Sequence, residues 1–192
     1  MSVLLNDNNS MLIGYQLGPK MIKHVESSIP KFESLLNIKP EINLFGRLIH
    51  ENRDVGFFSD ESAGYKYSNK IEKSKPLDEY LTKIMNVINS HFESKFNGIL
   101  INRYCTGLDY IGKHSDDERG LDSDAGVVAV SYGADRIFRI RDKKNGKIIL
   151  DISTSEYPVI QMAGDFQKYY THEVPIQRKV KDTRYSFTFR KH

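Results

Sequence analysis

Alternation of apolar and polar residues dominates the second half of the chain. From residue 98 onward the alternation has period two and β-forming residues are frequent, which is typical of strands that bury one face. Turn-forming residues separate seven such segments, among them Asn145-Gly146, a strong signal for a two-residue hairpin turn. The segments are GILINRY (98–104), GVVAVSY (126–132), RIFRIRD (136–142), KIILDI (147–152), YPVIQMA (157–163), KYYTHEV (168–174) and RYSFTFR (184–190).

A helical pattern precedes these strands and covers residues 76–96. Its apolar residues recur every three or four positions, which predicts one apolar face that covers a sheet. Pro76 suits a first helical turn, and Asp78 and Glu79 lie near the positive end of the helix dipole. A helix followed by many short strands predicts a mostly β fold with flanking helices (α+β), arranged as a sandwich or jelly roll.

The first 75 residues carry weaker patterns. Residues 1–40 predict irregular structure with one short helix near residues 20–28, and INLFGRL (42–48) predicts a strand. Residues 51–75 are rich in Gly, Ser, Asn, Lys and Tyr, so we expect a loop with hairpin-like pieces. Because no internal repeat or linker is present, residues 1–192 are expected to form a single domain.

Composition excludes several classes of protein. With 39% hydrophobic and 28% charged residues, the chain is an ordinary globular sequence. Its single cysteine, Cys105, cannot form an internal disulfide or a cysteine-based zinc finger, so we expect an intracellular protein. No apolar run approaches the roughly 18 residues of a membrane span, and the first residues do not resemble a signal peptide.

Net charge indicates little, but the distribution of charge indicates more. The formal charge is only +3, while basic residues gather late in the chain, in RIRDKKNGK and QRKVKDTR. Such clusters either contact phosphate groups or form solvated loops.

One histidine-x-acid pair has the geometry of a metal site. The chain contains three such pairs: His24 and Glu26, His91 and Glu93, and His114 and Asp116. In a helix, positions i and i+2 point about 200° apart, whereas in a strand they share one face. The first two pairs fall on predicted helices, so only His114 and Asp116, at the end of the extended segment DYIGKH, can converge on one metal.

A facial triad for Fe(II) needs a second histidine. His50 precedes the strand-rich region and His192 is the last residue, whereas His172 lies on a late predicted strand. By position alone, His172 is equally compatible with a metal ligand and with a hydrogen-bonded core histidine.

The last predicted strand adds an anion-binding pattern. Arg184, Ser186, Thr188 and Arg190 share one face of this strand, and its aromatic residues share the other. The two arginines, about 20 Å apart along an extended strand, are either surface residues or a receptor for the two ends of a small dicarboxylate. Together with His114, Asp116 and His172 they suggest Fe(II) and 2-oxoglutarate.

Several ordered blocks resemble the AlkB family of Fe(II)/2-oxoglutarate dioxygenases: LINRYCTGLDYIGKHSDDE, SYGADRIFRIRDK, QKYYTHEVP and RYSFTFRK. INLFGRLIH and AGYKYS are similar to the eukaryotic member that repairs double-stranded DNA, which extends the resemblance to residue 42. It implies a double-stranded β-helix (jelly-roll) catalytic core at 98–192, a buttressing helix at 76–96 and a nucleotide-recognition region at 42–75. It assigns no structure to the N-terminal extension, 1–41.

The resemblance also assigns the metal and cosubstrate residues. It implies that His114, Asp116 and His172 are the iron ligands. Arg184 is expected at the far carboxylate of 2-oxoglutarate and Arg190 near the metal. Three polar residues are expected to contact the cosubstrate: Asn102, Tyr104 and Ser186. Ser186 stands where the family commonly has Asn, so its shorter side chain is expected to weaken that contact.

Substrate contacts follow from the same resemblance. Glu118 matches an acid that reads the exocyclic amine of the target base, Tyr67 an aromatic residue that stacks on the base, and Phe45 a finger residue that fills the gap left by a flipped nucleotide. Arg178 and Lys179 match a basic loop that contacts the duplex. The alternatives are a core phenylalanine at 45, a loop tyrosine at 67 and a solvated charge run around 118.

One stretch departs from the duplex-repair member. Where that member has a Pro-Arg…Tyr-Gly stretch, this chain has ENRDVGFFSD, in which Arg53 and Phe58 are candidate substitutes.

The activity implied is oxidative demethylation of 1-methyladenine and 3-methylcytosine in DNA, with consumption of O2 and release of formaldehyde and succinate. The expected partner is alkylated DNA, with RNA as a further option, and the protein is expected to act as a monomer, away from membranes, in the nucleus or the cytoplasm. Three alternatives remain: the same chemistry on RNA or on a protein side chain, an inactive nucleic-acid-binding module, and a structural jelly roll without metal.

Overall fold

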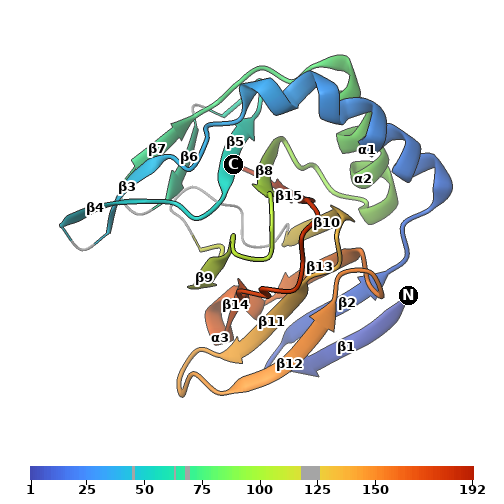
Figure 1. Ribbon diagram of the computed structural model, residues 1–192. Coiled ribbons are helices and arrows are strands. Elements are labelled where there is room, and N and C mark those ends of the chain that lie inside the picture. Colours follow the sequence, from blue (N-terminus) through green and yellow to red (C-terminus); the bar gives the residue numbers. More distant parts are fainter. Residues whose placement is uncertain (45, 63, 68–69, 118–125) are drawn as a thin grey trace.

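The computed structural model describes residues 1–44, 46–62, 64–67, 70–117 and 126–192 (Figure 1). Two antiparallel sheets form its centre. The seven-stranded sheet contains, in spatial order, β1 (Ser2–Asp7), β2 (Ser10–Tyr15), β13 (Val159–Gly164), β10 (Val127–Gly133), β15 (Arg184–Arg190), β8 (Gly98–Tyr104) and β5 (Asp54–Phe58). The four-stranded sheet contains β12 (Ile148–Ser153), β11 (Ile137–Asp142), β14 (Tyr170–Val174) and β9 (Ile111–His114).

Smaller elements complete the described chain. Two further hairpins pair β3 (Glu41–Leu44) with β4 (Arg47–His50), and β6 (Gly64–Tyr67) with β7 (Lys70–Lys73). The helices are α1 (Pro19–Phe32), a 3-10 turn (Glu33–Leu35), α2 (Glu79–Phe92) and the short α3 (Phe166–Tyr169), which leads directly into β14.

The core has two layers, one on each face of the seven-stranded sheet. Helices α1 and α2 lie side by side against one face, where Val25, Ile84 and Phe187 are completely buried (Figure 1). The second layer lies between the two sheets and contains Met162 and Ile140. Strand β15 is therefore buried along its whole length, with its aromatic residues toward the helices and its arginines toward the other sheet.

The predicted helix begins later than the pattern indicated. Asp78 caps α2, because its carboxylate accepts hydrogen bonds from the backbone amides of Tyr80 (2.9 Å) and Leu81 (2.7 Å). The helix ends where Glu93 adopts a left-handed conformation (φ 50°). Within the described residues, no helix is long and apolar enough to cross a membrane.

Two expectations for the first 50 residues were wrong. The segment expected to be irregular contains the β1–β2 hairpin, and β2 extends the seven-stranded sheet by pairing with β13. The segment INLFGRL forms the two strands of the β3–β4 hairpin instead of one strand. In the first hairpin, Asn8 and Asn9 both have positive φ (51° and 56°), as a tight two-residue turn requires.

Candidate metal and cosubstrate site

His114, Asp116 and His172 converge at one end of the four-stranded sheet. His114 closes β9 and is paired directly with His172 on β14, and Asp116 follows two residues after β9. Nε2 of His114 lies 3.8 Å from Oδ1 of Asp116, and Nε2 of His172 lies 3.6 Å from Oδ2. One ligand atom from each residue falls within 4.8 Å of the others, so the three can hold one ion, as the sequence predicted.

Burial and neighbouring charges set the protonation of this triad. Burial alone would raise the pKa of Asp116, but Arg190 and the two histidines lower that pKa below its usual range. Burial lowers the pKa of His172 to about 3 and also lowers the pKa of His114. At neutral pH the site therefore presents a carboxylate and two neutral imidazoles, which are the forms that bind a divalent cation.

Several contacts orient the triad. Nδ1 of His114 lies 2.9 Å from the carbonyl oxygen of Gly112, and the ring of Phe138 stacks on His172 with 5.2 Å between the ring centroids. The guanidinium of Arg190 donates to Oδ1 of Asp116. Hydrogen bonds of this kind fix the orientation of metal-binding side chains before the ion arrives.

A cavity between the two sheets is lined by the triad at one end and by both polar and apolar side chains. Its polar lining comes from β8 and β15, which are paired so that Tyr104 is opposite Arg184 and Asn102 is opposite Ser186. Because positions i and i+2 share one face of a strand, this register directs the side chains into the same space. Sequence reasoning predicted these four residues and Arg190 as cosubstrate contacts, and the structure brings all five around one cavity.

Arg184 is a buried cation whose hydrogen bonds are incomplete. It is 1% exposed, its NH2 group donates to Oγ of Ser131 (2.7 Å), and its guanidinium carbon lies 5.2 Å from the centre of the Tyr104 ring. Its Nε and NH1 groups make no hydrogen bond to the described residues. Two such donors inside a cavity are suited to an anion.

Arg53 lies inside the site rather than on its outer surface. It is 3% exposed, its Nε donates to Oδ1 of Asn102 (2.7 Å), and its NH1 forms an ion pair with Glu51 (2.6 Å). Its charge is also close enough to His114 to help lower the pKa of that histidine. Arg53 is thus positioned to orient Asn102, and its predicted contact with nucleic acid stays a prediction.

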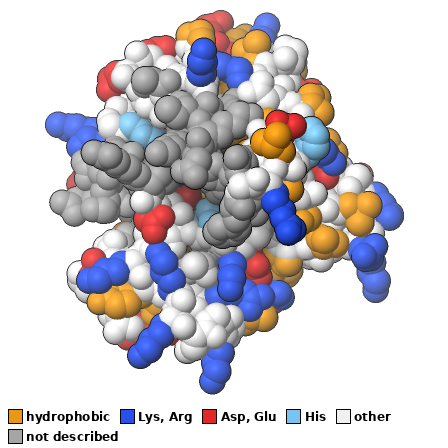
Figure 2. Space-filling model, turned by 90° about the vertical axis from the view of Figure 1, so that its left-hand side faces the viewer, with side chains coloured by type: hydrophobic (Ala, Val, Ile, Leu, Met, Phe, Trp, Pro, Cys, Tyr) orange, Lys and Arg blue, Asp and Glu red, His pale blue; other side chains and the backbone are white. Residues whose placement is uncertain are grey.

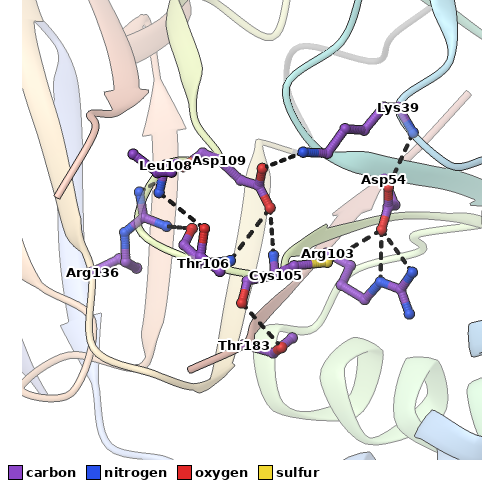
Figure 3. A network of polar contacts seen from close by, with 9 residues as sticks. All are labelled: Lys39, Asp54, Arg103, Cys105, Thr106, Leu108, Asp109, Arg136 and Thr183. Atoms are coloured by element: carbon purple, nitrogen blue, oxygen red, sulfur yellow. Dashed lines mark hydrogen bonds and ion pairs between the residues drawn. The ribbon is translucent and has the colours of Figure 1, made fainter. Parts of the chain in front are cut away.

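A polar network fixes the turn that joins β8 to β9 (Figure 3). Oδ2 of Asp109 accepts from the backbone amide of Cys105 (2.7 Å), and Oδ1 accepts from Lys39 (2.7 Å). Arg136, which is completely buried, donates to the carbonyl oxygens of Thr106 (3.1 Å) and Asp109 (2.8 Å). The network keeps the strand that carries Asn102 in a fixed relation to β9.

The predicted substrate residues are described only in part. Phe45 and Glu118, and the side chain of Tyr67, lie outside the described residues. Arg178 and Lys179 are exposed on the loop between β14 and β15.

Phe58 is completely buried in the core formed with the helices. It cannot take part in recognition in this conformation, so its proposed substitution for the missing motif is wrong.

Two residues at the site were missed by sequence reasoning. Ser131 accepts from Arg184, and the side chain of Gln167 accepts from the backbone amide of Asp116 (2.9 Å). Register could have suggested Ser131, because it lies opposite Ser186 on the neighbouring strand β10. No sequence pattern points to Gln167. It lies between two segments predicted as strands (157–163 and 168–174), and helix α3 was not predicted.

The residues present fit Fe(II) and a dicarboxylate. Two imidazoles and one carboxylate are the donor set of a facial triad, and Oδ2 of Asp116 accepts no hydrogen bond from the described residues. The donors of Arg184 and the cation of Arg190 provide the charge that a dianionic cosubstrate requires.

Comparisons with known proteins agree with this geometry. Residues 34–190 match the 2OG-Fe(II) oxygenase superfamily. The chain is 27% identical to human "DNA oxidative demethylase ALKBH2" over 97% of this chain and 73% of that protein. It is 31% identical to human "Alpha-ketoglutarate-dependent dioxygenase alkB homolog 3" over 66% of this chain and 47% of that protein.

A solved structure, OsALKBH1, has a similar fold. It superposes with a TM-score of 0.62 at 18% identity and covers 97% of this chain and all of that one. The predicted jelly-roll core and the resemblance to the AlkB family are thereby confirmed. Fe(II) is the metal cofactor of this superfamily and 2-oxoglutarate and O2 are its cosubstrates, as predicted, and the chain belongs to the 2OG-Fe(II) oxygenase superfamily.

Proposed function

We propose that the protein oxidatively removes N-linked methyl groups from nucleic-acid bases, with 1-methyladenine and 3-methylcytosine in DNA as its substrates. The observation that carries this proposal is the triad of His114, Asp116 and His172 beside a cavity that contains the buried Arg184. Support for nucleic acid as the substrate comes from the relatives, of which human ALKBH2 is named a DNA oxidative demethylase.

His114, Asp116 and His172 would hold the iron. Bound there, Fe(II) with 2-oxoglutarate and O2 supplies the chemistry that converts an N-methyl group to an N-hydroxymethyl group, while 2-oxoglutarate becomes succinate and carbon dioxide. The N-hydroxymethyl group would then lose formaldehyde: the hydroxyl proton leaves to solvent, the C=O bond forms, and the C–N bond breaks with its electron pair returning to the base nitrogen. The protein contributes position and charge: the low pKa values of the three ligands keep them deprotonated.

Arg184 and Arg190 would hold 2-oxoglutarate. Arg184, at the end of β15 remote from Asp116, would bind one carboxylate through Nε and NH1. Arg190 contacts Asp116 and so lies near the metal end of the cavity. Asn102, Tyr104 and Ser186 line the wall between the arginines and would supply the remaining polar contacts.

A second hollow beside Asp116 favours a large, partly charged substrate. It has a volume of about 460 Å³ and is lined in part by Lys143, Lys168 and Asp117. Lysine and arginine side chains gather on the lower half of the face in Figure 2, below the undescribed residues. The lining also carries the carboxylates of Asp116, Asp117 and Asp165, and Lys143 is ion-paired with Asp117, so Lys143 and Lys168 would contact only part of a phosphate backbone that delivers a flipped base, whose extrusion costs a few kcal/mol.

The test is a panel of four methylated substrates: duplex DNA, single-stranded DNA and RNA that each carry one 1-methyladenine, and a methyl-lysine peptide. Loss of one methyl group is measured by mass spectrometry with Fe(II), ascorbate and 2-oxoglutarate. We expect 2-oxoglutarate-dependent loss from DNA and none in an Asp116→Ala variant. Loss from RNA alone or from the peptide alone would contradict the proposed substrate and support the alternative on which it occurred.

A further inference from the structure

Gln167 connects the two segments of the chain that carry the triad. It lies on α3, five residues before His172, and its Oε1 accepts a hydrogen bond from the backbone amide of Asp116 (2.9 Å). A parallel contact runs from Oγ of Ser115 to the carbonyl oxygen of Tyr170 (2.9 Å). The segment that ends in Asp116 is therefore attached directly to the segment that leads into β14.

The backbone of Gln167 is itself firmly anchored. The preceding residue, Phe166, is completely buried between the sheets. Nζ of Lys143 donates to the carbonyl oxygen of Gln167 (3.0 Å) and to the carboxylate of Asp117 (2.9 Å). Lys143 thus holds both the backbone of Gln167 and the side chain of Asp117, the residue after Asp116. The side chain of Gln167 therefore reaches Asp116 from a fixed position.

The amide group of Gln167 is held at both ends. Its Nε2 lies 3.5 Å from the sulfur of Met162, a residue that lines the cavity beside the triad. This contact leaves Oε1 directed at the amide of Asp116. On the other side, Arg190 holds Oδ1 of the same aspartate. Asp116 is thus held through its backbone N–H by Gln167 on α3 and through its carboxylate by Arg190 on β15.

We propose that Gln167 is a positioning residue that preorganises the Asp116 carboxylate for metal binding by accepting the backbone N–H of that residue. The inference rests on the proposed metal site and adds a residue outside the ligand set. Without the acceptor, the Ser115–Asp116 segment keeps the contact of Ser115 with Tyr170 and that of the Asp116 carboxylate with Arg190, but the backbone N–H of Asp116 loses its partner. Loss of a contact that orients a ligand typically weakens metal binding by about 10- to 100-fold.

The experiment compares side chains at position 167 in the full-length chain. Gln167→Met keeps the length of the side chain and removes the acceptor, whereas Gln167→Glu keeps an acceptor. The matched control is Gln161→Met, because Gln161 on β13 also accepts a side-chain hydrogen bond, from Tyr15 (2.7 Å), and points away from the triad. Mn(II) is titrated into each metal-free protein, and free Mn(II) is measured by electron paramagnetic resonance, with urea unfolding in parallel.

We expect Gln167→Met to raise the Kd for Mn(II) by about tenfold or more. Gln167→Glu and the control should stay within about threefold of the wild type. A Gln167→Met protein that binds within twofold of the wild type would overturn the inference, as would equal losses in the Met and Glu variants. Absence of Mn(II) binding to the wild type would instead overturn the metal site on which the proposed function depends.

If Gln167→Met does not fold, Gln167→Asn decides the question. The asparagine side chain is shorter by one methylene group, which moves the acceptor away from the backbone N–H of Asp116. The expected result is a folded protein with a measurably higher Kd for Mn(II). An unchanged Kd in that variant would overturn the inference.

Discussion

Arg184 offers a sharp test, because its replacement should harm binding without harming the fold. The Arg184→Met variant retains an apolar stem against Tyr104 and removes a buried charge with two donors, Nε and NH1, that lack partners among the described residues. A buried cation of this kind stabilises the free protein little, since each buried unsatisfied polar group costs about 1–3 kcal/mol. The same cation has its full value only when an anion enters the cavity.

The expected effects on 2-oxoglutarate affinity and on stability differ greatly in size. Each charge-assisted hydrogen bond contributes about 1.5–3 kcal/mol, so loss of the Nε and NH1 donors removes about 3–6 kcal/mol of 2-oxoglutarate binding. At 1.4 kcal/mol per factor of ten, affinity should fall by about 10²- to 10⁴-fold. The free energy of unfolding should change little, because replacement of a buried charge by an apolar group is often neutral or stabilising by about 1–4 kcal/mol, which offsets about 1.5–3 kcal/mol for the lost charge-assisted bond to Ser131.

Isothermal titration of 2-oxoglutarate into the Mn(II)-loaded protein measures the affinity, and urea unfolding of the metal-free protein measures stability. Arg139→Met is the matched control, since Arg139 forms an ion pair with the carboxylate of Asp151 on the outer side of the four-stranded sheet (2.7 Å). It should leave the affinity for 2-oxoglutarate unchanged and shift stability by less than about 1 kcal/mol. An Arg184→Met protein with normal affinity, or one destabilised by more than about 2 kcal/mol, would refute the assignment of Arg184 to the cosubstrate.

Three further predictions concern stability. Arg136→Met should lower the free energy of unfolding, measured with urea, by about 3–5 kcal/mol. The reason is that hydrogen bonds from its buried guanidinium join the 105–110 turn to residues 175–177. A loss below about 1 kcal/mol would contradict this structural role. Gly107→Ala places a Cβ 1.8 Å from the carbonyl oxygen of Gln177, so the loop should become more sensitive to limited proteolysis, whereas an unchanged digestion rate would argue against this close approach. The pKa of His172 in the folded protein is about 3, below the usual 6.5, so only the unfolded state takes up this proton between pH 6.5 and 3. The free energy of unfolding of the metal-free protein should therefore fall by about 2 kcal/mol between pH 7 and pH 5, which urea unfolding at each pH can check.

The strands near the site could be predicted because both their faces carry a period-two pattern. GILINRY and RYSFTFR match β8 and β15 residue for residue. The β1–β2 hairpin was missed. Its turn, Asn8-Asn9, does carry a signal, because asparagine tolerates positive φ better than other non-glycine residues. Its strands contain short apolar runs, which periodicity alone does not assign to a strand or a helix.

The pair His114 and Asp116 could be predicted because a His-x-Asp pair on an extended segment has few geometric options, whereas the assignment of His172 as the third ligand came from the resemblance to the AlkB family. The supporting residues could not. Arg136 looked like one of several polar positions in RIFRIRD, yet it is completely buried by loops that lie about 30 and 40 residues away in the chain. Gln167 reaches Asp116 from 51 residues away. Contacts of that kind depend on the tertiary fold and leave no local periodic signal.

The proposed demethylation is tested most directly by the stoichiometry of turnover on a DNA duplex with a single 1-methyladenine. Succinate and repaired base are measured in the same reaction, for the wild type and for Asp116→Ala. We expect one succinate for each methyl group removed by the wild type, and neither product from the variant. Demethylation that persists in Asp116→Ala would contradict the proposed metal site. Succinate formation by the wild type that the methylated duplex does not stimulate, with no repaired base formed, would contradict the proposed substrate.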